Sequence, residues 1–481
     1  MLRWRILLSF AMLFLCVFEI CSSKEVEVVA SDPTDFDSAV AGYEAWVDSK
    51  PYAKFIEKTR DWVCLYHFLV LMTPACMAPQ GGNLDPKLCC GAIKAFVQED
   101  QGKCLCQDRV ALNPAVFPFT LGVVKETKCD ITFPIPEVSD PMMLPRAIAA
   151  SPVCEGVPRT AGFTINPKFF EGAANTDPEE LPSFRELFTP PPSGPFPTSY
   201  TAVNVTRPTE SILVNNFSTP TTFQALVFYP SDKNLEENID PETGAVGSPV
   251  LANVGGKFPI VEFSPGFTGP PQIFILMMSH LASFGMVVIS QESTSQLRGS
   301  NDRAFSEAWA DDMAFGLLYL KNEGYNSRSF LHNRVDSTRA GIGGHSFGGA
   351  MSFPAARRAV DLGIGVQAVV SLQPSCVPFA GICDLAGDAG LDKLQGVDYL
   401  VVSGSADLSA LPSHAEYFAS LVQPTVTPKN LRGVNHCLVE LDPKFWLLGG
   451  DCGIGQISPM EQAKQVQELT GEFFKDKLVD S

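Results

Sequence analysis

The sequence predicts two units: a small helical domain held by disulfides, followed by an α/β domain built on a doubly wound, mostly parallel sheet. Three observations support this prediction. Eight cysteines crowd into residues 64–154, short β-branched runs alternate with helical segments after residue 200, and a Gly-x-Ser-x-Gly motif lies between one such run and a helix. Strands that alternate with helices are typical of open parallel sheets covered on both faces.

Length and composition agree with two globular domains. The chain has 481 residues, of which 45% are hydrophobic and 18% are charged, so apolar material for a core is ample. This length exceeds the usual size of one domain. The formal net charge is −18, and so acidic a chain repels phosphate backbones. We therefore expect no nucleic-acid partner.

Residues 1–23 are predicted to be a secretory signal peptide. Arg3 and Arg5 precede an apolar run over residues 6–18, and small residues lie near Ser23, where a peptidase would cut. A membrane anchor is the alternative, but the run is short for a span of about 20 residues. We expect a secreted, extracellular protein that passes through the secretory pathway and has no transmembrane segment in its mature chain.

Cysteine usage and glycosylation sequons favour export. Loss of the signal peptide would remove Cys16 and Cys21 and leave twelve of the 14 cysteines, an even number, as an oxidised protein needs. Asn204-Val-Thr and Asn216-Phe-Ser are acceptor sequons for N-glycosylation. The sequence therefore predicts a disulfide-bonded glycoprotein.

Residues 24–160 are predicted to form the cysteine-rich helical domain. Apolar residues recur at helical spacing between Trp62 and Met72, and Asp85-Pro86 is typical of a helix start. So short a unit needs covalent bridges, and we expect four disulfides. The eight cysteines are Cys64, Cys76, Cys89, Cys90, Cys104, Cys106, Cys129 and Cys154.

This order of cysteines resembles the eight-cysteine helical domains of plant lipid-transfer proteins. Residues 71–76 (Leu-Met-Thr-Pro-Ala-Cys) and 104–106 (Cys-Leu-Cys) carry the resemblance, although the interval from Cys129 to Cys154 is longer than the family pattern. The resemblance implies a tunnel and hence an acyl-chain ligand in this domain. A disulfide-rich domain without a ligand is the alternative.

Residues 161–199 are predicted to be a linker, and residues 200–481 the α/β domain. Residues 189–197 (Thr-Pro-Pro-Pro-Ser-Gly-Pro-Phe-Pro) are stiff and extended, because proline fits neither a helix interior nor a central strand. In the α/β domain, helices are expected over residues 306–322, 349–360 and 415–422. The expected strands are residues 225–229, 260–263, 286–290, 340–343, 368–372 and 399–403.

Residues 344–349 (Gly-His-Ser-Phe-Gly-Gly) are the strongest functional signal in the sequence. A Gly-x-Ser-x-Gly between a strand and a helix is typical of a nucleophile elbow, a turn so tight that only small residues fit beside the serine. We therefore expect Ser346 to be a catalytic nucleophile. A glycine-rich turn without catalytic function is the alternative.

Attack on a carbonyl group also requires hydrogen-bond donors for the oxyanion that forms. One expected donor is the backbone N–H of Phe347, which directly follows the nucleophile. The other is the backbone N–H of Phe267, in a glycine-containing loop after the strand predicted over residues 260–263. An ordinary strand-to-helix turn is the alternative reading of that loop. Phe267 and Phe274 are also expected to contact the substrate.

The acid of a catalytic triad is expected between the nucleophile and the base in chain order. Asp407 lies just past the strand predicted over residues 399–403, where a carboxylate can orient a histidine. Asp384, Asp388 and Asp392 are the alternatives, but none directly follows so clear a strand.

Two histidines, His414 and His436, follow both the nucleophile and the acid. His436 lies in a loop near the C-terminus, where the base belongs. His414 stands at the start of an apparent helix and is interpreted as a capping or surface residue. His345 adjoins the nucleophile and is interpreted as structural. Ser346, Asp407 and His436 are thus the predicted catalytic residues.

The cysteines and histidines of this domain suggest no metal chemistry. The histidines are scattered, and no phosphate loop or dinucleotide fingerprint opens a helix, so we expect neither metal nor cofactor. A bridge from Cys437 to Cys452 would hold the His436 loop, and Cys376 with Cys383 is a second candidate pair.

Residues 223–474 resemble a secreted branch of α/β-hydrolases that includes platelet-activating-factor acetylhydrolases, chlorophyllases and cutinase-type polyester hydrolases. Residues 258–267, 281–289, 333–336, 344–349 and 434–436 carry the resemblance. It implies the α/β-hydrolase fold and a Ser-Asp-His triad. Residues 372–375 (Leu-Gln-Pro-Ser) lack the tryptophan that polyester hydrolases have there.

The predicted function is hydrolysis of a carboxylic ester, with an apolar or lipid-like substrate, through an acyl-enzyme on Ser346. The aromatic and proline residues near the predicted site favour an apolar acyl or alkyl group. The alternative is a secreted or cell-surface lipid-binding protein whose hydrolase domain is inactive.

Overall fold

The computed structural model describes most of the chain from residue 194 onward. Of the amino-terminal part, it describes five residues, which are helical (Lys87, Cys90, Gly91, Ile93 and Lys94), and Cys90 is disulfide-bonded. The predicted signal peptide, the remainder of the predicted cysteine-rich domain and most of the predicted linker lie outside the described residues. The described ranges are 194–207, 213–214, 217–218, 222–232, 249–266, 271–292, 303–376, 382–391, 394–407, 410–422, 426–436, 457 and 459–480.

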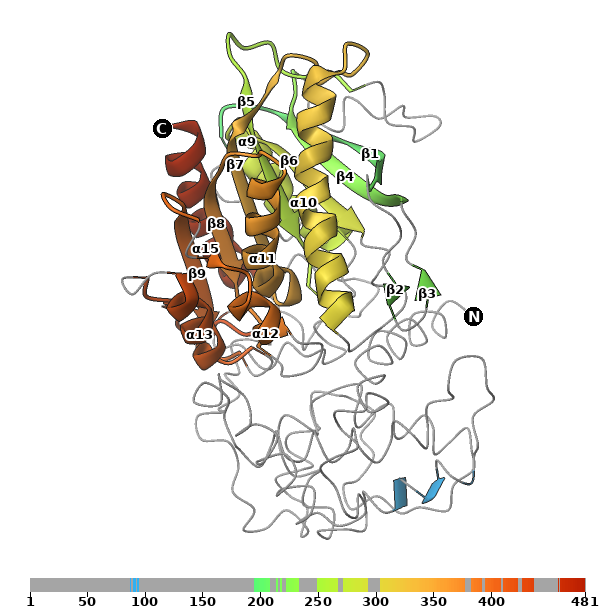
Figure 1. Ribbon diagram of the computed structural model, residues 1–481. Helices are drawn as coiled ribbons and strands as arrows, with labels where there is room; N and C mark the ends of the chain where they lie inside the picture. Colours follow the sequence, from blue (N-terminus) through green and yellow to red (C-terminus); the bar gives the residue numbers. More distant parts are fainter. Residues whose placement is uncertain are drawn as a thin grey trace.

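The core of the described part is an eight-stranded mixed sheet with the order β1-β4-β6-β5-β7-β8-β9-β10 (Figure 1). β4 runs antiparallel to both of its neighbours, β1 and β6, whereas every pair from β6 to β10 is parallel. The strands are β1 (Thr198–Thr206), β4 (Thr222–Pro230), β5 (Phe258–Ser264), β6 (Val287–Glu292), β7 (Val335–His345), β8 (Val366–Leu372), β9 (Asp398–Gly404) and β10 (Lys429–Leu431). A separate small hairpin joins β2 (Leu213–Val214) to β3 (Phe217–Ser218).

Helices cover both faces of this sheet (Figure 1). On one face, α10 (Arg303–Tyr325), α11 (Phe347–Asp361), α12 (Ile382–Gly387) and α13 (Pro412–Val422) share a core with residues such as Ile260 and Val369. On the other face, α9 (Ile275–Ser283), α15 (Pro459–Phe474) and the π-helical turn η12 (Lys475–Val479) share a core with Val261 and Phe263. Alternate residues of the central strands therefore face two separate cores, which explains why those strands read as continuous apolar runs.

All six predicted strands and all three predicted helices are present. β7 begins at Val335, five residues earlier than predicted. The prediction missed its first half because that half is polar and includes Ser337, Thr338 and Arg339. Two strands of the eight-stranded sheet, β1 and β10, and the two short strands of the β2–β3 hairpin were not predicted. β1 begins inside the range assigned to the linker, and β10 has just three residues, Lys429 to Leu431. No helix in the described part combines the length and the apolar character needed to cross a membrane.

Candidate active site

Ser346 occupies a sharp turn between β7 and α11. Its backbone has φ 56° and ψ −116°, a conformation that costs energy in any residue with a side chain. The turn is held in place because the Ser346 N–H donates to the carbonyl oxygen of Leu372 on β8 at 2.9 Å. This geometry lifts the serine side chain out of the strand-to-helix connection, as a nucleophile elbow requires.

The glycines of the motif are required by close backbone contacts. A Cβ on Gly344 would lie 2.6 Å from the carbonyl carbon of Gly348, and one on Gly348 would lie 2.3 Å from the carbonyl oxygen of Pro265. A Cβ on Gly349 would lie 2.8 Å from the carbonyl oxygen of Leu372. Because each obstacle is main chain, a larger residue would have to displace a strand or the first turn of α11.

Ser346, His436 and Asp407 form one hydrogen-bonded series. Nε2 of His436 lies 2.9 Å from Oγ of Ser346, and Nδ1 lies 2.9 Å from Oδ2 of Asp407. A carboxylate accepts hydrogen bonds, so Nδ1 carries the proton and Nε2 is free to accept the hydroxyl proton of Ser346. The second oxygen of Asp407 accepts the Ala410 N–H at 2.7 Å, and the Asp407 side chain is fully buried.

The loops that carry the acid and the histidine are bonded to one another. The Ser405 N–H donates to Leu431 and the Ala406 N–H to Val434, both at 2.9 Å. Gly404 allows this approach, because a Cβ there would lie 2.3 Å from the carbonyl oxygen of Val434. The acid loop after β9 and the histidine loop after β10 therefore form one structural unit.

Three buried side chains fix the main chain around His436. Gln462 of α15 accepts the Asn435 N–H at 2.9 Å, and Gln373 donates to the Asn435 carbonyl oxygen at 2.6 Å. Nε2 of His345 donates to the carbonyl oxygen of His436 itself at 2.8 Å. The sequence predicted a structural role for His345, but it offered no signal for the two glutamines, whose partners come from distant segments.

His345 lies beside the imidazole of His436, with the ring centroids 4.8 Å apart. Burial, followed by the neighbouring His436, holds the pKa of His345 well below its usual value. A neutral His345 donates one hydrogen bond and adds no positive charge next to a ring that would become cationic. The buried Phe274 packs against His345 and against Phe263, so its described contacts are with core residues rather than an open surface.

The structure describes some of the other candidate residues, and the rest lie outside the described part. Phe347 opens α11 and is buried, whereas Phe267, Asp392, Cys437 and Cys452 lie outside the described residues. Asp388 is exposed and pairs with Arg303 on α10 rather than with a histidine. Asp384 lies in the first turn of α12. Among the described residues, no three His, Cys, Asp or Glu side chains are grouped so that they could hold a metal ion.

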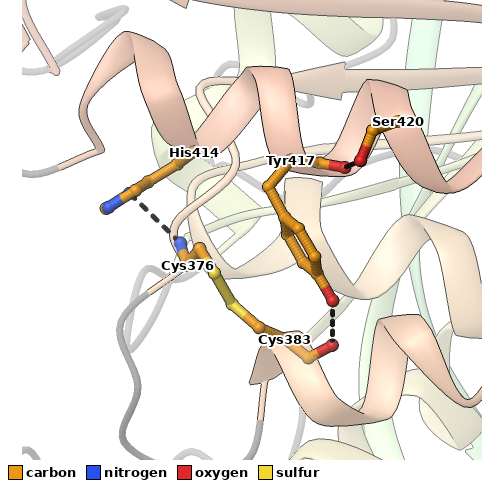
Figure 2. The surroundings of a disulfide bond; sticks show 5 residues. All are labelled: Cys376, Cys383, His414, Tyr417 and Ser420. Atoms are coloured by element: carbon orange, nitrogen blue, oxygen red, sulfur yellow. Dashed lines mark hydrogen bonds between the residues drawn. A yellow bond between two sulfur atoms is a disulfide. The ribbon is translucent and has the colours of Figure 1, made fainter. Parts of the chain in front are cut away.

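His414 corrects the interpretation as a surface residue, because it is buried. It lies in the first turn of α13, is 1% exposed, and its Nδ1 accepts the Cys376 N–H at 3.3 Å. The predicted pair Cys376–Cys383 is confirmed as a disulfide. Figure 2 shows this bridge between His414 and Tyr417, whose hydroxyl donates to the Cys383 carbonyl oxygen at 2.7 Å. These contacts join α13 to the segment that follows β8.

The strand order, the elbow and the placement of the acid and histidine loops are consistent with the α/β-hydrolase fold. Residues 242–375 match a family model described as "PETase: PET hydrolase-like". The matched region contains Ser346 and ends before Asp407 and His436.

Two curated proteins are similar to parts of this chain. The bis(hydroxyethyl) terephthalate hydrolase of Streptomyces coelicolor is 31% identical over 169 residues, which are 34% of this chain and 45% of that protein. Cutinase 2 of Thermobifida cellulosilytica is 30% identical over 114 residues, which are 24% of this chain and 38% of that protein. The matches thus span less than half the length of either relative.

Proposed function

We propose that this protein hydrolyses carboxylic esters, with Ser346 as nucleophile, His436 as general base and Asp407 as the acid of the triad. The observation that carries the proposal is the pair of 2.9 Å contacts that His436 makes with Ser346 and Asp407. The names of the two relatives and the matched family model support the same class of reaction.

The reaction begins when Ser346 Oγ attacks the ester carbonyl carbon and passes its proton to Nε2 of His436. The buried carboxylate of Asp407 stabilises the resulting imidazolium and keeps Nδ1 protonated. Collapse of the tetrahedral intermediate breaks the ester bond, and His436 gives its proton to the leaving alcohol. Water then attacks the acyl-enzyme by the same steps, which releases the acid and restores Ser346.

The oxyanion of each tetrahedral intermediate needs donors that are already in place. The Phe347 N–H is one proposed donor, since it directly follows the nucleophile at the N-terminus of α11. The Phe267 N–H is the second, on the loop that leaves β5 at Ser264. The helix dipole of α11 adds favourable potential at this end of the helix.

The proposed substrate is an ester with an apolar acyl or alkyl part. The relatives are named for a terephthalate ester and for cutin, and the family model for PET, which favours this class. Phe267 is proposed to line the substrate site, and Phe274 is proposed to support that site from its buried position behind His345. We also propose an acyl-chain ligand for the amino-terminal cysteine-rich domain, on its resemblance to lipid-transfer domains.

We further propose that the protein is exported and glycosylated. The Cys376–Cys383 disulfide supports passage through an oxidising compartment. Asn204 of the first sequon is exposed on β1, at the edge of the sheet, where a glycan would have room. Digestion of the exported protein with an amidase specific for N-glycans, followed by mass spectrometry of wild type and Asn204→Gln, tests both statements.

The decisive test of the function is hydrolysis of p-nitrophenyl esters of increasing acyl length. Ser346→Ala is expected to reduce kcat by at least about 10⁴-fold, and labelling by a fluorophosphonate probe should disappear with it. Ser420→Ala is the matched control, because this serine bonds to the Tyr417 carbonyl oxygen on α13. Full activity in Ser346→Ala would refute the assignment. A folded wild-type protein with neither activity nor labelling would favour the lipid-binding alternative.

A further inference from the structure

Trp309 is a fully buried residue on α10 whose indole N–H is directed at the end of β5. Its Nε1 donates to Oγ of Ser264 at 2.8 Å. The same oxygen accepts Nε2 of Gln291 at 3.0 Å, and the Ser264 hydroxyl donates to the Pro265 carbonyl oxygen at 3.3 Å. A serine hydroxyl has one donor and two acceptor positions, so all of them are occupied.

The main chain that Ser264 anchors lies against the nucleophile elbow. A Cβ on Gly348 would be 2.3 Å from the Pro265 carbonyl oxygen, and a Cβ on Gly266 would be 3.2 Å from Cβ of Ser346. Residues 264–266 therefore contact the first turn of α11 and the base of the nucleophile. This segment leads directly to Phe267, the second proposed oxyanion donor.

Trp309 also touches the first proposed donor residue. Its ring packs edge-on against the ring of Phe347, with centroids 4.8 Å apart and planes at 69°. One buried side chain thus contacts Phe347 through its ring and, through a hydrogen bond, the segment that leads to Phe267. Trp309 is remote in sequence from both segments and lies in the body of a 23-residue helix, so it provides a rigid reference.

We propose that Trp309 is a positioning residue that holds residues 264–266, which lead to the second proposed oxyanion donor, in place against Phe347, which supplies the first. This inference rests on the proposed ester hydrolysis. Donor groups must stay within about 0.5 Å of the productive geometry to stabilise an oxyanion, and they act on the transition state more than on the bound ester. Loss of the indole N–H should therefore lower kcat and leave KM nearly unchanged.

The test compares Trp309→Phe, Ser264→Ala and the double variant with wild type. Trp309→Phe keeps an aromatic ring near Phe347 and removes the N–H, and Ser264→Ala removes the acceptor of the same bond. Each single variant is expected to lower kcat by about 10- to 100-fold, which is a smaller effect than the removal of a whole oxyanion donor would have. The double variant should lose no more than the larger single effect, because both changes break the same Trp309–Ser264 hydrogen bond.

Tyr417→Phe is the matched control. It also deletes one buried aromatic donor, which bonds at 2.7 Å to the Cys383 carbonyl oxygen beside the Cys376–Cys383 disulfide (Figure 2). Its kcat should remain that of wild type even if its melting temperature falls. Inhibition by an alkyl trifluoromethyl ketone, which forms a tetrahedral oxyanion on Ser346, should weaken in Trp309→Phe in proportion to kcat and stay unchanged in Tyr417→Phe.

The outcomes separate this inference from the function on which it rests. An active wild-type protein whose folded Trp309→Phe variant keeps kcat and ketone affinity within two-fold would overturn the role of Trp309 and leave the ester hydrolysis standing. If Trp309→Phe does not fold, Ser264→Ala decides by the same criterion. A wild-type protein that hydrolyses no ester refutes the proposed function, and the positioning role with it.

Discussion

His345, the residue directly before Ser346, holds the main chain of His436, and the side chain of His436 contacts Ser346. Nε2 of His345 donates to the carbonyl oxygen of His436 at 2.8 Å, while Nε2 of His436 lies 2.9 Å from Ser346 Oγ. The nucleophile and the proposed base are therefore linked twice, once through side chains and once through a backbone carbonyl. His345 is buried and neutral, which makes this link insensitive to pH in the neutral range.

Replacement of His345 by phenylalanine tests this link. His345→Phe keeps a ring between Phe274 and His436 but leaves the His436 carbonyl oxygen without this donor. We expect kcat/KM for a p-nitrophenyl ester to fall by about 10-fold, which corresponds to a loss of about 1.4 kcal/mol in transition-state stabilisation. His332→Phe, in the segment before β7, serves as the control and should retain activity. Unchanged kinetics in His345→Phe would show that the link is dispensable.

The elbow glycines provide a prediction about folding. Gly348→Ala would place a Cβ 2.3 Å from the carbonyl oxygen of Pro265, so α11 or the end of β5 must move. We expect a loss of more than about 3 kcal/mol in the free energy of unfolding and no detectable hydrolysis. Gly255→Ala is the matched control, since nothing lies within 4 Å of its Cβ position. Chemical denaturation of the two variants measures the difference, and equal stability would contradict the packing described for the elbow.

A buried carboxyl in the centre of the sheet predicts that stability declines as pH rises. Glu262 of β5 is fully buried, neither of its oxygens has a hydrogen-bond partner among the described residues, and burial raises its pKa well above 4.5. The folded state therefore favours the protonated form. The stability that this preference of Glu262 contributes is fully present below the pKa of the unfolded state, and it is lost as pH rises through the pKa of the folded state.

Glu262→Gln removes this titration while it keeps the size of the side chain. We expect the melting temperatures of the variant and the wild type to agree near pH 4.5 and to diverge at higher pH, with the variant more stable. Glu323→Gln, near the C-terminal end of α10, is the control for the loss of one negative charge. A constant difference across the pH range would show that Glu262 has the same pKa in the folded and unfolded states and would contradict this account.

The burial of His280 predicts that stability declines as pH falls, the opposite of the effect of Glu262. It is buried between α9 and Gly471 of α15, and burial lowers its pKa from 6.5 to about 4. Stability that depends on the neutral ring is present above pH 6.5 and is lost as pH falls through the folded pKa. The full difference corresponds to about 3 kcal/mol. In His280→Gln, the free energy of unfolding should change less between pH 7 and pH 4 than in wild type, and an equal decline would refute this account.

The sequence predicted the elements that have a strong local pattern. Six strands with continuous apolar or β-branched runs were located, because burial on both faces imposes that pattern. β10 was missed since Lys429-Asn-Leu has no such pattern and forms a strand by pairing with β9. β1 was missed because it lies at the edge of the sheet, where exposed polar residues such as Asn204 and Thr206 alternate with buried ones.

The residues of the candidate site divide in the same way, into those with a local sequence signal and those without one. Ser346, Asp407 and His436 could be proposed from strand order and the elbow motif, and their side chains meet in the structure. Their catalytic roles stay predictions until activity is measured. Gln373, Gln462 and Trp309 could not be found from the sequence, because each acts on a segment more than 25 residues away. His414 was misjudged because a position in the first turn of a helix does not reveal whether that turn faces solvent.

The short strand β10 has a consequence for how the protein would lose activity. It carries three residues and, in the part of the chain that the structure describes, pairs with β9 alone at the end of the sheet. Small opening fluctuations concentrate where backbone pairing is sparse. Amide protons around residues 429–436 should therefore exchange earlier than those of β5 or β7. On gentle heating, the protein would lose its proposed base through local opening while its central sheet remained folded, so that inactivation would begin below the melting temperature and reverse on cooling.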